Sequence, residues 1–92
     1  MIIRRSEQQD LQMIKYVNKQ CLKENYSDDW WESYLLQWHN LLLVACHKNE
    51  IVGYIVGEIE NDIGYIASIA VLENFRNRGL GKQLLLQVHE AM

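Results

Sequence analysis

The segment with the clearest chemical signal runs from Arg76 to Lys82 and reads RNRGLGK. Gly79 and Gly81 let the backbone approach a ligand closely because neither carries a Cβ atom. The residues that follow have helical spacing, and the free N–H groups at a helix N-terminus attract negative charge. Arg76, Arg78 and Lys82 add positive charge around the same turn. The segment therefore predicts an anion-binding turn.

Two common nucleotide-binding motifs do not fit this turn. A P-loop would require glycine where Arg76 stands and serine or threonine where Gln83 stands. A dinucleotide-binding fingerprint that starts at Gly79 would require a further glycine where Leu84 stands. The pattern that does fit begins with Gln or Arg, has Gly three positions later and ends with Gly or Ala two positions after that. Arg76, Gly79 and Gly81 satisfy it. A nucleotide-binding protein is thus disfavoured, and a glycine-rich connection without a ligand is the plain alternative.

Two helices are expected in the N-terminal part of the chain. After a short strand over residues 1–5, Ser6 and Gln9 fit a capping box, in which each side chain bonds the backbone N–H of the other residue. Apolar residues then recur every three or four positions, and we expect this helix to end near residues 23–25. A second helix is expected to begin at residues 27–29, where acidic side chains suit the helix dipole. The apolar side of this helix carries Trp31, Tyr34, Leu35 and Trp38. This pattern favours a helix that docks its aromatic face on a sheet over a site where a cofactor stacks.

From Leu41 onward the apolar residues form nearly continuous runs, which are typical of strands covered on both faces. Turn residues at 47–50 and 61–64 separate three such runs, and this spacing predicts an antiparallel meander. Gly53 and Gly57 fit a bulge or a close backbone approach. The strands are expected at 41–46, 51–60 and 65–72, followed by a helix over 80–92. The fold class is therefore α/β (α+β), in the order strand, helix, helix, three-stranded meander, helix.

The composition is that of one small globular domain. The chain has 92 residues, a formal net charge of −3, 49% hydrophobic residues and 23% charged residues. The mild acidity leaves no large basic surface for nucleic acid, and the sequence has neither a membrane-spanning apolar run nor a signal peptide. Cys21 and Cys46 form no Cys-x-x-Cys pair, and His39, His47 and His89 lack the spacing of metal ligands. We therefore expect a cytoplasmic protein with no metal, no nucleic-acid partner and no membrane partner.

The turn and the run before it closely resemble the acetyl-CoA pyrophosphate loop of the GNAT superfamily of N-acetyltransferases. The resemblance rests on Arg76, Gly79 and Gly81 after the sequence IASIAV over 66–71. A second likeness points to a subgroup: CLKENY, over 21–26, is similar to the L-P-E-N-Y substrate loop of protein N-terminal acetyltransferases, with lysine in place of proline. The chain looks most like catalytic subunits of the NatA type and their archaeal relatives, and next most like ribosomal-protein alanine acetyltransferases.

The resemblance implies an enzyme that moves the acetyl group of acetyl-CoA to an amine, above all the α-amino group of a protein or peptide N-terminus. Such an amine has a pKa of about 7.7–8.0, so a weak base can neutralise it. The positions that match the family's base are Glu24 in the substrate loop and Tyr65 at the start of the third meander strand. The plain alternatives are that Glu24 is a solvated acid of the loop and that Tyr65 packs in the core with its hydroxyl in water. Leu22, Glu24 and Tyr26 would line the substrate groove.

For the cofactor, the resemblance implies binding by main-chain groups. The strand over 69–71 would pair with the pantetheine arm as an added strand, and an N–H near Val71 would hold the oxyanion. The implied cofactor-binding residues are Ile69, Ala70, Val71, Arg76, Asn77, Arg78, Gly79, Leu80, Gly81 and Lys82.

The resemblance also implies that residues 1–92 are the N-terminal part of one longer domain. The remainder would supply a strand that is parallel to 65–72 and splayed from it, one wall of the cofactor cleft, and the acid that protonates the CoA thiolate. Without it, the apolar edge at 65–71 predicts self-association of the chain. Two alternatives stay open: a non-catalytic CoA-binding or scaffold module, and an acetyltransferase that acts on a small-molecule amine.

Overall fold

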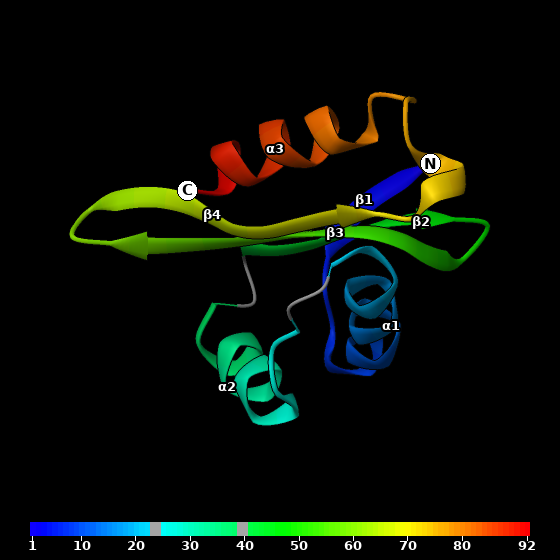
Figure 1. The fold of residues 1–92 in the computed structure, drawn as a ribbon. Helices are drawn as coiled ribbons and strands as arrows, with labels where there is room; N and C mark the ends of the chain where they lie inside the picture. The colour runs from blue at the N-terminus through cyan, green and yellow to red at the C-terminus, as the bar shows by residue number, and fades with distance from the viewer. Residues whose placement is uncertain (23–24, 39–40) are drawn as a thin grey trace.

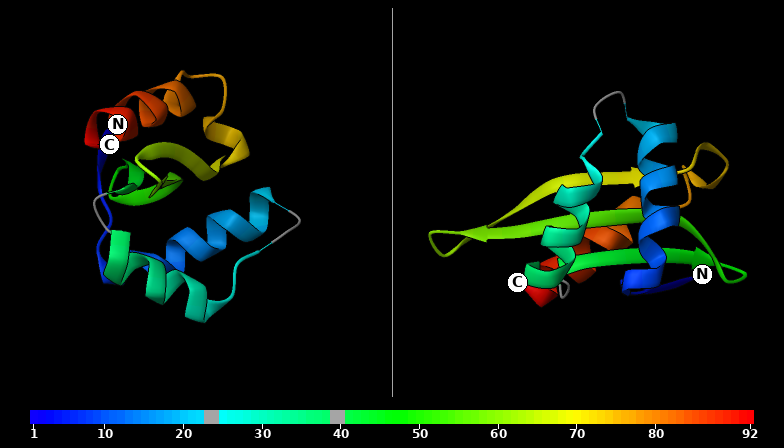
Figure 2. Two further views of the ribbon diagram at one scale, coloured as in Figure 1. Left: turned by 90° about the vertical axis from the view of Figure 1, so that its left-hand side faces the viewer. Right: turned by 90° about the horizontal axis from the view of Figure 1, so that it is seen from below.

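The computed structural model describes residues 1–22, 25–38 and 41–92, and it shows a four-stranded antiparallel sheet with helices on both faces (Figure 1). The strand order is β1-β2-β3-β4, so β1 and β4 are the two edges. Helices α1 and α2 cover one face and α3 covers the other, as the left view of Figure 2 shows. The expected order of elements is confirmed. The elements are β1 (Ile2–Arg5), η1 (Gln8–Asp10), α1 (Leu11–Cys21), α2 (Asp28–Trp38), β2 (Leu42–His47), β3 (Glu50–Glu60), β4 (Ile63–Val71), η3 (Glu73–Phe75) and α3 (Leu80–Ala91).

Two tight hairpins produce the meander. Their central residues, 48–49 and 61–62, all have left-handed backbone, with φ between 51° and 69°. A pair of positive φ values is typical of a two-residue type I′ turn, whose twist matches that of the strands it joins. The turn expected over 61–64 is therefore shorter, and β4 begins at Ile63 instead of Tyr65.

The cap of the first helical stretch differs by one residue from the expected one. Asp10, not Gln9, reaches back, and its carboxylate accepts a 2.7 Å hydrogen bond from the Glu7 backbone N–H. Ser6 donates its N–H to a β2 carbonyl instead. Arg4 explains the difference, because its guanidinium binds the Asp10 carboxylate at 2.7 and 3.0 Å. This hydrogen-bonded pair lowers the pKa of Asp10 from its usual value, so the ion pair is lost only as the pH falls through that lowered value.

Helix α1 is shorter than expected, whereas α2 begins where expected. Leu22 has an extended backbone, with φ −127° and ψ 143°, so α1 ends at Cys21 instead of near residues 23–25. At the start of α2, the Ser27 hydroxyl accepts a 3.1 Å hydrogen bond from an N–H in the first turn, as an N-cap does. Trp31 and Tyr34 on the apolar side of α2 are buried against the sheet as predicted, whereas the predicted side-chain packing of Trp38 lies outside the described part of the structure.

The ladders contain two irregularities, and both involve the glycines of β3. The register of β3 against β4 shifts between Val56 and Gly57, which leaves Ala67 of β4 without a direct partner. Such a bulge bends the strand and re-aims its neighbours. A second shift, against β2, lies beside Gly53. A Cβ on Gly57 would also lie 2.8 Å from the Met92 Cε atom at the end of α3. Gly57 therefore lies at a bulge and also permits a close approach, the two roles expected for it.

The two faces of the sheet have separate apolar cores. The core beneath α1 and α2 includes Ile14, Val17, Trp31, Val44 and Tyr54. The core beneath α3 includes Leu43, Val52, Ile55, Leu84 and Val88.

None of the described helices is long and apolar enough to cross a membrane.

One polar network is buried in the core beneath α1. The side-chain amide of Asn18 donates a 2.9 Å hydrogen bond to the Tyr54 hydroxyl, which shares a 2.8 Å hydrogen bond with the Ser68 hydroxyl. These residues belong to α1, β3 and β4, and burial is the main cause that raises the pKa of Tyr54. Buried polar groups are costly when unpaired, so the network favours one position of α1 over β4.

We expect Tyr54→Phe to lower the free energy of unfolding by about 1–3 kcal/mol, because it leaves the Asn18 amide and the Ser68 hydroxyl without their shared partner. Tyr16→Phe is the matched control, because Tyr16 on α1 is 49% exposed and its change should stay within about 0.5 kcal/mol. Urea unfolding measures both variants. Equal unfolding midpoints for the two would show that the network adds no stability.

Candidate functional site

The turn between η3 and α3 has the backbone that its glycines predicted. Gly79 is the N-cap of α3 with a left-handed φ of 74°, and no atom lies within 4 Å of the position that a Cβ would take. Asn77 is left-handed as well, with φ 64°. The helical ladder starts with the Gln83 N–H, which bonds the Gly79 carbonyl at 3.0 Å. The N–H groups of residues 80–82 therefore have no acceptor within the helix, and the turn can bind an anion such as a phosphate.

The basic side chains around the turn point in different directions. Arg76 donates a 2.8 Å hydrogen bond from Nε to the Val71 carbonyl at the end of β4. The guanidinium of Arg78 lies 5.3 Å from the centroid of an aromatic ring in η3, and Lys82 is exposed on α3. The Leu80 side chain is buried, so this residue offers only its backbone. The candidate anion site is therefore built mainly from backbone, with positive charge close by.

The register of β4 decides which of its backbone groups face outward. The Leu72 N–H bonds the Val52 carbonyl of β3 at 2.8 Å. Antiparallel residue pairs alternate between bonded and non-bonded, so Ala70 also points its N–H and C=O toward β3. Ile69 and Val71 point theirs toward the outer edge. The register thus supports Ile69 and Val71 as main-chain partners of a ligand, while it directs the backbone of Ala70 into the sheet.

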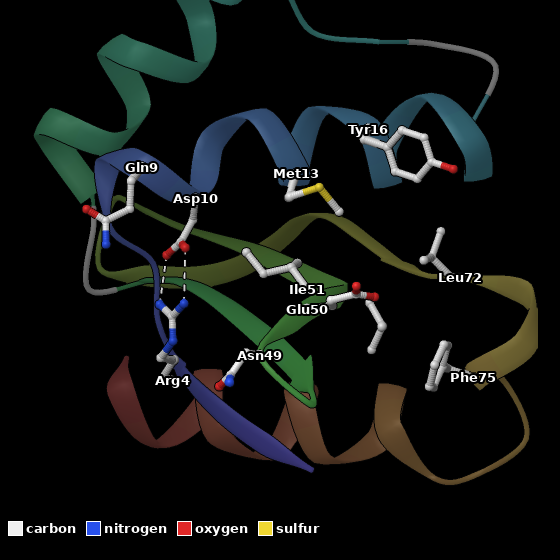
Figure 3. A pocket seen from close by; sticks show the side chains of 11 residues that line it. Arg4, Gln9, Asp10, Met13, Tyr16, Asn49, Glu50, Ile51, Leu72 and Phe75 are labelled. Carbon is white, nitrogen blue, oxygen red and sulfur yellow. Dashed lines mark hydrogen bonds and ion pairs between the residues drawn. The ribbon is translucent and has the colours of Figure 1, made fainter.

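A hollow of about 480 Å³ opens between α1, the β2–β3 hairpin and η3 (Figure 3). Met13 and Tyr16 from α1 and Phe75 from η3 line it, and the ion pair of Arg4 with Asp10 lies at one side. Because these two charges neutralise each other, this hollow is a poor candidate for the binding of an anion.

A second hollow, of about 460 Å³, shares Tyr16 and Phe75 with the first and lies beside the end of β4. Cys21 and Arg76 line it, and both donate to the Val71 carbonyl, the thiol at 3.4 Å and the guanidinium at 2.8 Å. This hollow therefore lies where the outward backbone of β4 meets the basic turn. An extended ligand arm that starts at the turn and follows β4 would run beside it.

The loop after α1 contacts β4 at the bulge. The Tyr26 hydroxyl donates a 3.3 Å hydrogen bond to the Ala67 carbonyl, and its ring stacks on Trp30 with centroids 3.9 Å apart. Leu22 is exposed at the start of this loop. Glu24, the candidate base of the same loop, lies outside the described residues. The structure thus brings Tyr26 to β4, and the role of Glu24 stays a prediction.

Tyr65 lies on β4 before the bulge and is 41% exposed. It stands opposite Glu58 in the β3–β4 register, and its hydroxyl donates to the Glu58 carboxylate and, at 3.4 Å, to Glu60. The hydrogen bond to Glu58 is the main cause that raises the pKa of Tyr65 to about 12. The phenol is therefore protonated at neutral pH, so its oxygen can take up a proton only if its own proton moves elsewhere.

Glu58 is the residue of this region that the sequence analysis missed. The expected turn over 61–64 hid it, because only a two-residue turn at 61–62 brings Glu58 opposite Tyr65. The signal was present in the adjacent residues Asn61 and Asp62, since both types tolerate the left-handed backbone of a type I′ turn.

Comparison with known proteins bears on the same residues. The model of the Acetyltransferase (GNAT) family matches residues 6–92. The chain is 37% identical over 95 residues to the N-terminal acetyltransferase A complex catalytic subunit NAA10 of Arabidopsis thaliana, covering 98% of this chain and 50% of that protein. It is 34% identical over 98 residues to the N-alpha-acetyltransferase daf-31 of Caenorhabditis elegans, covering 100% of this chain and 54% of that protein.

A solved structure agrees with these sequence matches. Naa20 of Chaetomium thermophilum, in complex with a bisubstrate analogue, superposes with a TM-score of 0.87 and 25% identity over 99% of this chain and 55% of that chain. The chain thus spans about half the length of the curated relatives it matches. The family match reaches from before η1 to the end of α3 and includes the Gly79 turn. The chain therefore belongs to the GNAT family of acetyltransferases.

Proposed function

We propose that this protein is an N-acetyltransferase that moves the acetyl group of acetyl-CoA to the N-terminal α-amino group of a protein or peptide. The observation that carries the proposal is the continuity of the Gly79 turn with the outward backbone of β4. A ligand with phosphate at one end and an amide-containing arm at the other would use both features. Two curated relatives that are named as N-terminal or N-alpha-acetyltransferases support the choice of acceptor.

In this proposal, the turn holds the pyrophosphate of acetyl-CoA on the N–H groups of residues 80–82. The outward groups of Ile69 and Val71 pair with the amides of the pantetheine arm, as in the addition of a strand. The Val71 carbonyl then exchanges its bonds to Cys21 and Arg76 for a bond to the arm. The Val71 N–H stabilises the thioester oxygen as negative charge develops on it.

The acceptor would enter on the side of α1 and α2. Leu22 and Tyr26 line its groove, and Glu24 or Tyr65 neutralises the α-ammonium group before it attacks the thioester. We place the reaction in the cytoplasm, where the free thiols of Cys21 and Cys46 stay reduced. Residues 1–92 would form the N-terminal portion of the single acetyltransferase domain.

We expect Gly79→Val to weaken the binding of acetyl-CoA by more than tenfold, because a branched side chain would occupy the space where the pyrophosphate lies. Isothermal titration calorimetry of the full-length protein measures the affinity. Asn61→Val is the control for backbone strain, since Asn61 is also left-handed, with φ 53°, but lies in the β3–β4 turn. Arg78→Ala should weaken binding only a few-fold, because an exposed charge contact is weak. An unchanged affinity of folded Gly79→Val would contradict the assignment of the turn.

We expect one of two variants, Glu24→Gln or Tyr65→Phe, to lower kcat about 10²-fold with little change in the affinity for acetyl-CoA, because the loss of a general base has about this size. The first variant removes a carboxylate at nearly constant shape, and the second removes only a hydroxyl. Steady-state transfer to peptides with a free N-terminus measures kcat. Normal turnover in both variants would place the base elsewhere. Acetyl-CoA binding without turnover in the unmodified protein would favour a non-catalytic module instead.

We expect the separate chain of residues 1–92 to self-associate at micromolar concentration. The outward backbone of β4 can pair with a second copy, and Leu86 on α3 is 56% exposed. Sedimentation velocity measures the distribution of species. A single monomeric species with cooperative unfolding and full turnover would contradict this expectation.

A further inference from the structure

The immediate partner of Tyr65 is a carboxylate on the neighbouring strand. Glu58 of β3 stands directly opposite Tyr65 of β4, and its carboxylate accepts the phenolic hydrogen. Glu58 is partly buried, whereas Tyr65 is 41% exposed. Tyr65 also lies near Ala67, where the hydroxyl of Tyr26 reaches the strand from the loop after α1. The phenol therefore belongs to the strand that Tyr26 contacts and is hydrogen-bonded to the carboxylate of Glu58.

We propose that Glu58 is the final acceptor of the proton that leaves the acceptor amine, with Tyr65 as the group that passes it on. This inference rests on the proposed function and adds a residue to its proton path. Glu58 does not touch the amine, so its role is to position the phenol of Tyr65 and to take up its proton.

The proton transfers and bond changes balance without any further reagent. A proton of the α-ammonium group moves to the phenolic oxygen of Tyr65, and the phenolic proton moves to the carboxylate of Glu58. The freed nitrogen lone pair forms the C–N bond with the thioester carbonyl carbon. The C–S bond breaks, its electron pair leaves with sulfur, and the CoA thiolate takes up one proton from solvent. The second proton that the nitrogen loses passes to solvent, Glu58 releases its proton to solvent, and both Tyr65 and Glu58 end the cycle as they began.

The other groups near the phenol do not provide this path. Glu60, also on β3, accepts from the Tyr65 hydroxyl only at 3.4 Å. From α2, the Tyr34 hydroxyl donates to the Gly57 carbonyl, next to Glu58. Burial, followed by the charge of Glu58, raises the pKa of Tyr34 above its usual range, so Tyr34 keeps its proton. Among the described residues, Glu58 is thus the carboxylate best placed to receive the proton.

The first test measures the coupling of Glu58 to Tyr65 without any turnover. The full-length protein is labelled with ¹³Cζ-tyrosine, and the Tyr65 resonance is identified by its loss in Tyr65→Phe. We expect the phenol to titrate with a pKa near 12 in the unmodified protein and nearer to the ordinary value of about 10 in Glu58→Gln. Glu60→Gln is the matched control and should change the titration less. An unchanged titration in Glu58→Gln would overturn the proposal.

The second test measures turnover. We expect Glu58→Gln to lower kcat roughly tenfold to hundredfold at an unchanged KM for acetyl-CoA. Glu58→Asp keeps the carboxylate and should recover part of the loss, which separates proton acceptance from a role in folding. Glu60→Gln should retain kcat.

The outcomes separate this inference from the proposed function. Equal losses in Glu58→Gln and Glu60→Gln would indicate a general effect of surface charge and overturn the proposal. If Glu24→Gln loses turnover while Glu58→Gln and Tyr65→Phe keep it, the base is Glu24, and the proton path is wrong although the acetyl transfer stands. If the unmodified protein transfers no acetyl group to any peptide, the proposed function itself fails, and the proton path fails with it.

Discussion

Strand β4 is bonded to a neighbour on one side only, while helices cover both of its faces. Its outward N–H and C=O groups are therefore held in fixed positions and still accessible, and the candidate site depends on this combination. Tyr26 bonds this edge at Ala67, Arg76 bonds it at Val71, and the Gly79 turn follows its end. The buried network of Asn18, Tyr54 and Ser68 joins α1 to β3 and β4 and so favours one position of the helix above the strand.

Features that depend on neighbours in the sequence could be predicted from it. The Gly79 turn follows from residue types that tolerate left-handed backbone and from the helix that begins beside them. The meander follows from apolar runs separated by polar turns. The β3–β4 turn is two residues shorter than the expected 61–64, because Asn61 and Asp62 close the hairpin alone. That error of two residues was enough to hide the pairing of Glu58 with Tyr65.

Features that depend on distant residues could not be predicted in this way. Asp10 rather than Gln9 caps η1 because Arg4, on the preceding strand, fixes its carboxylate. The backbone of Ala70 turns into the sheet because of the β3–β4 register, which no local pattern encodes. Asn18 is a partial exception: its polar side chain on the apolar side of α1 signals a buried partner, but only the fold shows that the partner is Tyr54.

The aromatic residues beside the loop after α1 have a spectroscopic consequence. All three tryptophans of the chain belong to α2, and the Tyr26 ring stacks on Trp30 at 3.9 Å and meets Trp31 edge-on at 5.6 Å. The Gly79 turn follows the opposite end of β4 from Tyr65 and has no tryptophan of its own. The fluorescence of Trp30 and Trp31 therefore reports on the segment that contains Tyr26. Emission and calorimetry, read together, distinguish occupation of that segment from occupation of the glycine turn without an added label.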